Sequence, residues 1–576
     1  MKAKDSLVEL TVPLTLQKKI LIFVIILYPV LFIFQGGDLT DAGFFALSYQ
    51  NFFYNLNFGE TNSISILSDF IGASWLVFFP KLGILGLKIL TLIFLYLVIG
   101  MIFSILKDFT ENRLLLLFGI FCGVVFSTRF SLFVFGRDDV SWFFLILTSF
   151  FTIKGLRLNR NIFFCISGIF FVFASFSRFP NIVFSLFLPF ILAYFHFYKS
   201  KAISFLQILT PLKQYFSFVL GSFSTLLVIL VFFKYLNIYD IFLNNLYFIS
   251  DSADSTYTSS YSFFQLFKSY FIDCVFFIPH LVSIILVMFA TSLVYAYSSI
   301  KNIVQPFFLF IIIVFIFSFI FYSSFSYSSN IKYLVPGFCS FPLMLSVHKK
   351  DKFSLLVVLY CFLMITQVAG SNTGLFLKFS PGFMVLIPLS LLIFSEKGRL
   401  FFCNVKIYTR PIFIFGMLLI IFLSVYARLG FIYHVDSGIT CRLRCIYPIE
   451  HKKMLGIFTT KENANHIQNL SIAIERNISS DKNLFIYGHQ PMFYYLTESF
   501  PPVKKTWLIN NYVKVDELFT SLENSIKSSG RYPTIVDTKQ RIMGEKGQKR
   551  LEYFLKEYEY ECKERTDNFD IWIKKR

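Results

Sequence analysis

The sequence predicts a polytopic α-helical membrane protein, with about 13 transmembrane helices and a small C-terminal α/β extracytoplasmic domain. Composition is the first observation. Hydrophobic residues make up 56% of the 576 residues, charged residues only 15%, and Phe occurs 80 times. A soluble globular protein carries roughly 25% charged residues. A chain with so few cannot cover its surface with polar groups, so a soluble protein is excluded for most of its length.

The second observation is an uneven distribution of charge. Residues 1–447 contain 49 charged side chains, whereas the remaining 129 residues contain 38. We therefore expect a transmembrane domain at 1–430 that includes a first outer loop at 36–81, a linker at 431–447, and a water-soluble α/β domain at 448–576.

The third observation is a series of apolar segments that approach the roughly 20 residues needed to cross a bilayer. Thirteen candidate spans centre on 19–35, 82–106, 114–131, 140–155, 161–177, 181–198, 213–233, 271–298, 303–323, 333–347, 353–370, 379–395 and 411–429. Residues 70–80 read as a re-entrant piece or as part of the loop.

Loop charge sets the expected orientation. With a cytoplasmic N-terminus, the cytoplasmic connections carry 20 Lys and Arg residues and the opposite ones carry 8. Positive residues concentrate on the cytoplasmic side, so we expect a multi-pass protein of the bacterial inner membrane whose C-terminal domain is extracytoplasmic. Loop residues also account for much of the net charge of +19. No nucleic-acid partner is expected, and membrane lipids are expected partners.

The C-terminal domain shows alternating helix and strand patterns. Helical periodicity covers 462–478, 514–529 and 546–558, and short β-rich runs occupy 483–488, 532–538 and 569–575. After the first run, His489 and Tyr494 are candidate contacts for a sugar acceptor through ring stacking and hydrogen bonds. The alternative is a structural aromatic cluster with a hydrogen-bonded His.

Two carboxylates stand at the start of the first outer loop. Asp38 and Asp41 are three residues apart in GGDLTDAGFF, so on a helix they share a face. Either Asp38 or Thr40 could instead cap that helix, where an acid is favoured by the helix dipole. The loop contains no basic residue before Lys81.

A second acidic site follows the third predicted span, in FGRDDVSW. Arg137, Asp138 and Asp139 lie where the chain leaves the bilayer. Adjacent carboxylates can bind a divalent metal or a basic substrate group, and they can equally cap the next helix. A divalent metal ion is thus a candidate cofactor at either acid pair, although neither pair requires one.

Cations occur in two other outer turns. Arg178 lies in SFSRFPN, and Asn372 and Lys378 lie in AGSNTGLFLKFSPG. An Arg facing a cavity at the membrane boundary suits a phosphate, and the alternative is snorkelling to the headgroups. The glycine-rich turn is either a phosphate or sugar contact or a helix C-cap followed by a loop.

Taken together, carboxylates and cations gather on one predicted membrane face, where polar groups are functional candidates. This set is what transfer from a phosphate-linked donor needs. A carboxylate removes the acceptor hydroxyl proton, and cations hold the departing phosphate. Arg137, Arg178 and Lys378 are the candidate phosphate ligands, and Asn372 is a candidate sugar contact.

At these residues the sequence resembles the polytopic glycosyltransferases of the GT-C superfamily, in particular bacterial members of the protein O-mannosyltransferase and 4-amino-arabinose lipid A transferase group. These proteins carry an Asp-Glu-Gly-Tyr-like string soon after the first span. Here the string is Asp41-Ala42-Gly43-Phe44, so Asp41 matches and Ala42 replaces the Glu. The turn at 178–181 and the acids at 138–139 also resemble the group, as does a tyrosine-rich YYLT string in the C-terminal domain.

The resemblance implies a polyprenyl-phosphate sugar donor, a glycan, lipid or protein acceptor of the cell envelope, and inversion at the anomeric carbon. It implies Asp41 as the base, with Asp38 taking part in that role. Two other functions stay open. An O-antigen-type polysaccharide polymerase shares the donor chemistry, and a lipid or polysaccharide transporter (flippase) would need no transfer chemistry.

Two cysteines lie just after the last predicted span, in DSGITCRLRCIYP. In an oxidising compartment Cys441 and Cys445 could form a small disulfide loop. The alternative is a pair of free thiols.

Overall fold

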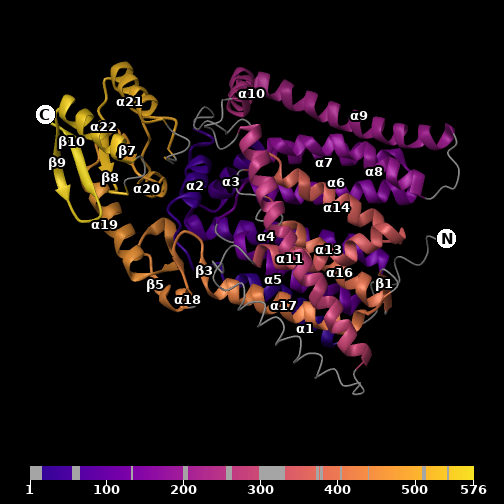
Figure 1. Ribbon diagram of the computed structural model, residues 1–576. Coiled ribbons are helices and arrows are strands. Elements are labelled where there is room, and N and C mark those ends of the chain that lie inside the picture. Colours follow the sequence, from indigo (N-terminus) through magenta and orange to yellow (C-terminus); the bar gives the residue numbers. More distant parts are fainter. Residues whose placement is uncertain are drawn as a thin grey trace.

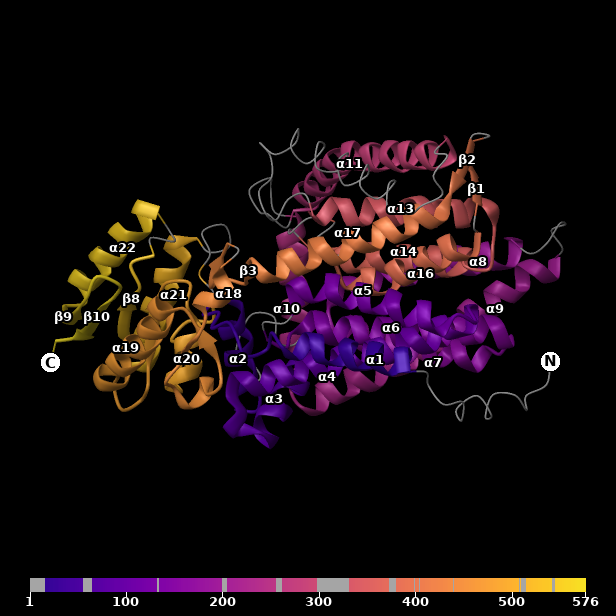
Figure 2. The same cartoon turned by 90° about the horizontal axis from the view of Figure 1, so that it is seen from below.

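The computed structural model describes residues 16–54, 65–131, 134–198, 205–254, 262–297, 331–371, 375, 380–397, 399–402, 405–438, 440–506, 508, 514–540 and 544–575. It is mostly helical, with a small strand-containing C-terminal region. A bundle of long helices lies on one side, and the C-terminal region lies at one end of the helices in both views (Figures 1 and 2). We call this end of the bundle the domain end.

The described part of the bundle is built from helices that match the predicted apolar runs, except for α10. They are α1 (Leu16–Val30), α4 (Gly83–Leu106), α5 (Arg113–Ser131), α6 (Arg137–Leu158), α7 (Asn161–Ser177), α8 (Phe184–Tyr198), α9 (Phe205–Tyr235), α10 (Tyr239–Asp254), α11 (Phe263–Tyr297), α13 (Ile331–Lys349), α14 (Ser354–Val368), α16 (Phe383–Lys397) and α17 (Thr409–Leu429). A hairpin of β1 (Arg399–Phe402) and β2 (Val405–Tyr408) separates the last two helices.

Twelve of the 13 predicted spans therefore correspond to helices, and the span at 303–323 lies outside the described residues. Within the described ranges, four helices are long and apolar enough to cross a membrane: Pro80–Phe109, Arg137–Leu158, Phe179–Phe197 and Leu209–Tyr235. Six further apolar helices are shorter. The count of 13 spans stays a prediction.

The first predicted outer loop is not an open loop. Its described part folds into α2 (Asp41–Asn51) and α3 (Ile66–Phe78), followed by a 3₁₀ turn (Pro80–Leu82) that leads directly into α4. Both helices lie at the domain end, where α2 lies between the bundle and the C-terminal region and α3 lies to one side of α2, next to α4 (Figure 2).

The segment predicted as a linker also has structure of its own. It contains the short strands β3 (Phe431–Ile432) and β4 (Asp436–Ser437), which pair with each other, and the one-turn helix α18 (Cys441–Arg444). Cys441 and Cys445 are buried there as free thiols beside Ile432. The predicted disulfide is therefore not formed in this structure.

The C-terminal region is a small α/β fold. A two-stranded ladder of β5 (Tyr447–Pro448) and β6 (Phe458–Thr459) precedes α19 (Lys461–Asn477), β7 (Leu484–Tyr487), α20 (Met492–Thr497), α21 (Val515–Ser529), β8 (Thr534–Asp537), α22 (Gly544–Glu557), β9 (Tyr560–Arg565) and β10 (Asp570–Lys574). The sheet order is β7-β8-β10-β9, parallel between the first two strands and antiparallel elsewhere.

Three helices and three strands predicted for this region are confirmed, whereas β9 and α20 were not predicted. The helical periodicity predicts α19 correctly because this helix buries one face, with Ile467, Leu470 and Ile474 spaced three and four residues apart. Its N-terminus is capped by the Thr460 hydroxyl, which accepts a hydrogen bond from the Asn463 amide at 3.3 Å.

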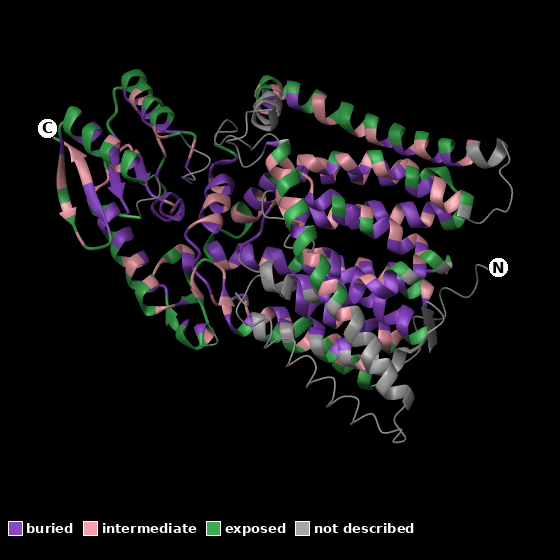
Figure 3. Ribbon diagram, viewed as in Figure 1, coloured by how far each residue is buried: buried purple, intermediate pink, exposed green. Residues whose placement is uncertain are grey.

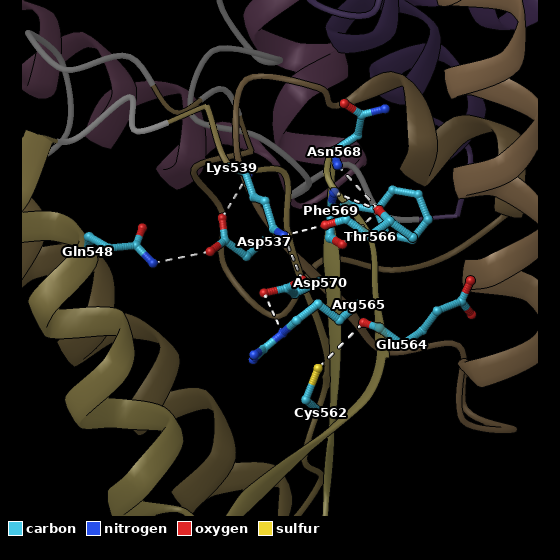
Figure 4. A network of polar contacts seen from close by, with 10 residues as sticks. All are labelled: Asp537, Lys539, Gln548, Cys562, Glu564, Arg565, Thr566, Asn568, Phe569 and Asp570. Carbon is cyan, nitrogen blue, oxygen red and sulfur yellow. Dashed lines mark hydrogen bonds and ion pairs between the residues drawn. The ribbon is translucent and has the colours of Figure 1, made fainter.

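Ion pairs join the end of β8 to the ends of β9 and β10 that lie beside it (Figure 4). Asp570 lies between Lys539, with Nζ at 2.9 Å, and Arg565, with Nε at 3.5 Å. Asp537, at the end of β8, accepts hydrogen bonds from the Lys539 amide and from the Gln548 side chain. The polar groups that Figure 4 connects with dashed lines have their partners within the C-terminal domain, so we assign this network a structural role.

The bundle and the C-terminal region share a hydrophobic core. Leu47 and Tyr49 of α2 belong to the same buried cluster as Ile467 of α19 and Met492 of α20. Backbone hydrogen bonds also cross this boundary, from the Phe458 amide to the Phe34 carbonyl at 2.7 Å and from the Met492 amide to the Leu39 carbonyl at 3.1 Å. Because α2 is clamped between the two, its carboxylates hold a defined position.

Candidate functional site

Asp38 caps α2. Its carboxylate accepts hydrogen bonds from the amides of Thr40 and Ala42, at 3.0 and 2.8 Å, and from the Thr40 hydroxyl at 2.7 Å. Burial raises the pKa of this carboxyl above its usual value, although the hydrogen bonds oppose the shift. With three donors already in place, Asp38 has the structural role that the sequence offered as the alternative, rather than that of a proton acceptor.

Asp41 has a different environment in the first turn of the same helix. One carboxylate oxygen, Oδ2, accepts a hydrogen bond from the Tyr433 hydroxyl at 2.5 Å. The other oxygen, Oδ1, is buried and has no hydrogen-bond partner among the residues that the structure describes. Burial and the negative charge of Asp41 hold the pKa of Tyr433 well above its ordinary value, so the phenol stays protonated as a donor. Asp41 thus has one oriented oxygen and one buried oxygen whose hydrogen-bonding capacity the described residues do not use.

Histidines surround this carboxylate. His434 packs its ring against that of Tyr433, with centroids 4.1 Å apart, and its Nδ1 lies 3.1 Å from the Thr40 hydroxyl. His489 follows β7 and is close enough for Asp41 to raise its pKa, although burial is the larger effect and lowers it overall. Three segments far apart in the sequence therefore meet at Asp41.

A small cationic pocket opens beside this carboxylate. Its cavity of about 30 Å³ lies between the end of α1, the start of α2, the second turn of α4 and the chain that follows α17. Lys88, Arg428 and Arg442 line it, together with Asp38 and Tyr433. Among the described residues that line it, basic side chains outnumber acidic ones three to one, because Asp38 is the one carboxylate.

The three cations are fixed by hydrogen bonds and ring stacking. Lys88 donates to the carbonyl of Gln35 at 2.8 Å. Arg442 donates to the Gln35 side chain, at 2.8 Å, and to the carbonyls of Arg428 and Phe431. The guanidinium groups of Arg428 and Arg442 lie 4.3 and 4.6 Å from the centre of the Phe32 ring, at cation–π distance. A buried set of like charges is costly without an anion.

The second acidic site lies at the start of α6. Asp139 accepts a hydrogen bond from the Gly136 amide at 2.9 Å and so caps this helix. Asp138 pairs with Arg178, with Oδ1 and Nε 3.5 Å apart. Arg137 makes no hydrogen bond or ion pair with the described residues, but its charge acts on the nearby Tyr49 and Asp69.

Arg178 ties helices together. It is 8% exposed and donates to the carbonyls of Gln367 and Ala369 at 2.5 and 2.9 Å, where α14 ends. Asn181 adds a second link, because its amide donates to the Ser141 hydroxyl at 2.7 Å. We therefore assign Arg178 a structural role, in which it links α6, α7 and α14, rather than the role of a phosphate ligand.

Contacts between α2 and the chain before α6 bring both acidic sites to the domain end. The Tyr49 hydroxyl donates to the Phe135 carbonyl at 2.9 Å, and the ring of Phe45 lies against Gly136. Among the predicted phosphate ligands that the structure describes, Arg137 therefore lies at this end without a partner in the described part of the chain, whereas Arg178 is paired. Asn372 and Lys378 lie outside the described residues.

Tyr494 has a structural place. It is 1% exposed, and its hydroxyl oxygen accepts a hydrogen bond from the Ile486 amide at 2.8 Å. Its ring belongs to the shared core and cannot stack on a sugar, whereas His489 stands at the boundary with α2. Among the described residues, no three His, Cys, Asp or Glu side chains come together as ligands for the candidate metal.

Sequence reasoning missed Lys88, Arg428, Arg442 and Tyr433. One of them could have been found, because Lys88 is the sole charged residue in the predicted span 82–106, and an ionisable group inside a span is a functional candidate. The other three lie in the last turn of a span or in the predicted linker, where charges are common. Comparison of the chain with protein-family models gives no match, and comparison with curated proteins gives none either.

Proposed function

We propose that this protein is a membrane glycosyltransferase of the bacterial inner membrane. It moves a sugar from a polyprenyl-phosphate-linked donor to a glycan, lipid or protein acceptor of the cell envelope, on the extracytoplasmic side. The observation that carries the proposal is the cationic pocket of Lys88, Arg428 and Arg442 beside the carboxylate of Asp41.

The pocket suits the phosphate of the donor. Three cations with one carboxylate leave an excess of positive charge at a site that is largely shielded from water. Charge-assisted hydrogen bonds from Lys and Arg are the usual means of holding a phosphate. The sugar and the lipid chain would lie outside the pocket, toward Asp41 and the surrounding bilayer.

Transfer then needs one displacement. Asp41 accepts the proton of the acceptor hydroxyl through the oxygen that has no partner in the structure, Oδ1. The acceptor oxygen forms the new bond to the anomeric carbon while the bond from that carbon to the phosphate oxygen breaks. The electron pair of the broken bond goes to the phosphate, whose added charge Lys88 and Arg442 stabilise. Attack from the opposite side inverts the anomeric carbon.

Tyr433 positions the base. Its hydroxyl holds Asp41 Oδ2, which leaves Oδ1 as the oxygen to receive the proton. The residue at position 42 is consistent with this arrangement. Ala42, which stands where the resembled string has Glu, is buried at the lining of the pocket, and its backbone amide donates to Asp38.

The test compares surface glycans and glycolipids, by mass spectrometry, from cells that carry wild-type protein or Asp41→Asn. We expect loss of a glycan modification with normal protein level and membrane insertion. Asp108→Asn is the matched control, because Asp108 is an exposed carboxylate beyond the opposite end of α4, where it pairs with Arg157. It should leave the glycans unchanged.

Each alternative function gives another outcome. Unchanged glycans in Asp41→Asn would refute the assignment of the base. Shortened polysaccharide chains would favour a polymerase. Movement of a lipid-linked sugar across proteoliposomes with no transfer product would favour a transporter.

A further inference from the structure

The turn between α3 and α4 is exposed and apolar. Residues 77–82, with the sequence VFFPKL, are six consecutive exposed positions, and Lys81 is the one charged residue among them. Val77 is 63% exposed and Phe78 is 77% exposed. Apolar side chains gathered in this way on a protein surface mark an interaction site.

The apolar surface continues onto α2 and the outer side of α3. Phe70, near the middle of α3, is exposed, and its ring centre lies 6.1 Å from that of Phe53, just past the end of α2. Tyr54 beside them is also exposed. We call residues 77–82 together with Phe53, Tyr54 and Phe70 the α3 edge.

The opposite side of α3 explains why the aromatic residues face outward. Its buried residues are small or polar: Ser68, Asp69, Gly72 and Ala73. A Cβ at Gly72 would lie 2.7 Å from the Tyr49 ring, so α2 and α3 pack too closely for a larger side chain. Asp69 is satisfied internally by the Ser65 hydroxyl at 3.0 Å. The helix thus hides its polar side and exposes its apolar side, the reverse of a helix that faces water.

We infer that the α3 edge lies in the surface layer of the bilayer that surrounds the bundle. The α3 edge is continuous in sequence with a helix long enough to cross a membrane, and this continuity identifies the bilayer as its partner. Residues 80–82 are the first residues of the apolar helical stretch Pro80–Phe109, one of the four long enough to cross a membrane. The α3 edge therefore joins that stretch where it enters the bilayer, at the side of the bundle in Figure 2.

The chemistry of the α3 edge agrees with this partner. Tyr rings such as that of Tyr54 concentrate at membrane–water boundaries at headgroup level, Phe and Leu side chains form the buried face of helices that lie in this layer, and a Lys beside them reaches the headgroups. Helices that lie in this layer bury their apolar side by roughly 5–10 Å. In the burial view the exposed residues of α9 likewise follow the outside of the bundle (Figure 3).

This placement has a consequence for the candidate site. Since α3 packs on α2, and α2 carries Asp41, the α3 edge would hold the carboxylate at a fixed height above the bilayer. The placement itself depends on exposed side chains and chain continuity alone, and so does not rest on the proposed function.

Photo-crosslinking of the full chain in lipid nanodiscs tests the inference. The photoreactive residue p-benzoylphenylalanine replaces Phe78 in nanodiscs of phosphatidylethanolamine and phosphatidylglycerol. Two matched positions serve as controls. Phe223 of α9, which is 62% exposed, should react with lipid, and Tyr553 of α22, which is 59% exposed, should not.

We expect the intact mass of the chain with the probe at position 78 to rise by one phospholipid after irradiation, with a yield close to that at 223 and at least about fivefold above that at 553. A yield at 78 no greater than at 553 would overturn the inference. A covalent dimer of the chain from position 78, without a lipid adduct, would also overturn it and would identify a second copy as the occupant.

Discussion

Gly43→Ala should weaken the clamp that holds α2 between the bundle and the C-terminal domain. A Cβ at this position would lie 2.2 Å from the backbone nitrogen of Met492 and 2.5 Å from its Cα. These atoms belong to the first residue of α20, so relief requires a backbone shift of about 1 Å rather than a side-chain rotation. The same nitrogen donates to the Leu39 carbonyl, and that hydrogen bond would be strained too.

The expected cost follows from two contributions. Overpacking in a well-packed core costs about 1–3 kcal/mol, and a lost backbone hydrogen bond adds about 1 kcal/mol. A total of about 2–4 kcal/mol corresponds to a drop of roughly 1–2 M in the urea midpoint of the C-terminal domain, for a slope of about 2 kcal/mol per M. Asp41 lies two residues before Gly43, so transfer activity should also fall.

Pulse proteolysis of the full chain in nanodiscs, across a urea series, measures this midpoint. Gly100→Ala is the matched control, because a Cβ at Gly100 of α4 meets no atom within 4 Å. That variant should match the wild type or gain slightly, since Ala favours a helix over Gly by about 0.5–1 kcal/mol. If Gly43→Ala has the midpoint of Gly100→Ala, the close docking of α2 on α20 is refuted.

Further predictions concern the pocket, the thiols and the histidines. Lys88→Met should weaken binding of polyprenyl phosphate by about 10- to 100-fold, the effect of losing a charge-assisted hydrogen bond; unchanged affinity in a titration would remove Lys88 from the phosphate site. Tyr433→Phe should reduce the transfer rate by less than removal of the base itself does, and an equal loss would mean that the phenol has a catalytic role of its own. Cys441 and Cys445 are buried free thiols, so a maleimide should label both only after denaturation without reductant; absence of labelling would reveal a disulfide. Burial lowers the pKa of His466 below its ordinary value of 6.5, so the unfolded state binds more protons and the C-terminal domain should lose stability as the pH falls below about 6.5; His466→Gln should flatten this dependence in urea titrations at several pH values.

The helices of the bundle were predictable because their cause is local. A run of apolar residues forms a helix wherever backbone groups must be satisfied without water, and the ends of α4, α7 and α17 fall within two residues of the predicted ends. The same holds for the C-terminal domain, where the period of 3.6 marks α19, and short runs of aliphatic, aromatic and β-branched residues mark β7 and β8.

The candidate site was only partly predictable. The sequence shows that a residue is Asp or Arg, but not whether its side chain binds a substrate or a helix end. Asp41 and Asp38 were both expected to be catalytic, and three residues separate them. Tertiary contacts distinguish them, since Asp38 receives three hydrogen bonds at the start of α2, whereas Asp41 receives one from Tyr433, 392 residues away. Arg178 likewise donates a hydrogen bond to a backbone carbonyl at the end of α14, nearly 200 residues later in the sequence, and so has a structural role.

The sequence by itself determined that most of this chain is apolar helix, that a polar α/β domain follows it, and which few charged residues deserved attention. Those results depend on composition and local periodicity. Only the tertiary structure decided which charges share a pocket, because Lys88, Arg428 and Arg442 come from α4, from the end of α17 and from the chain beyond it. Their convergence depends on how helices distant in sequence pack, and packing geometry leaves no trace in the local pattern of residues.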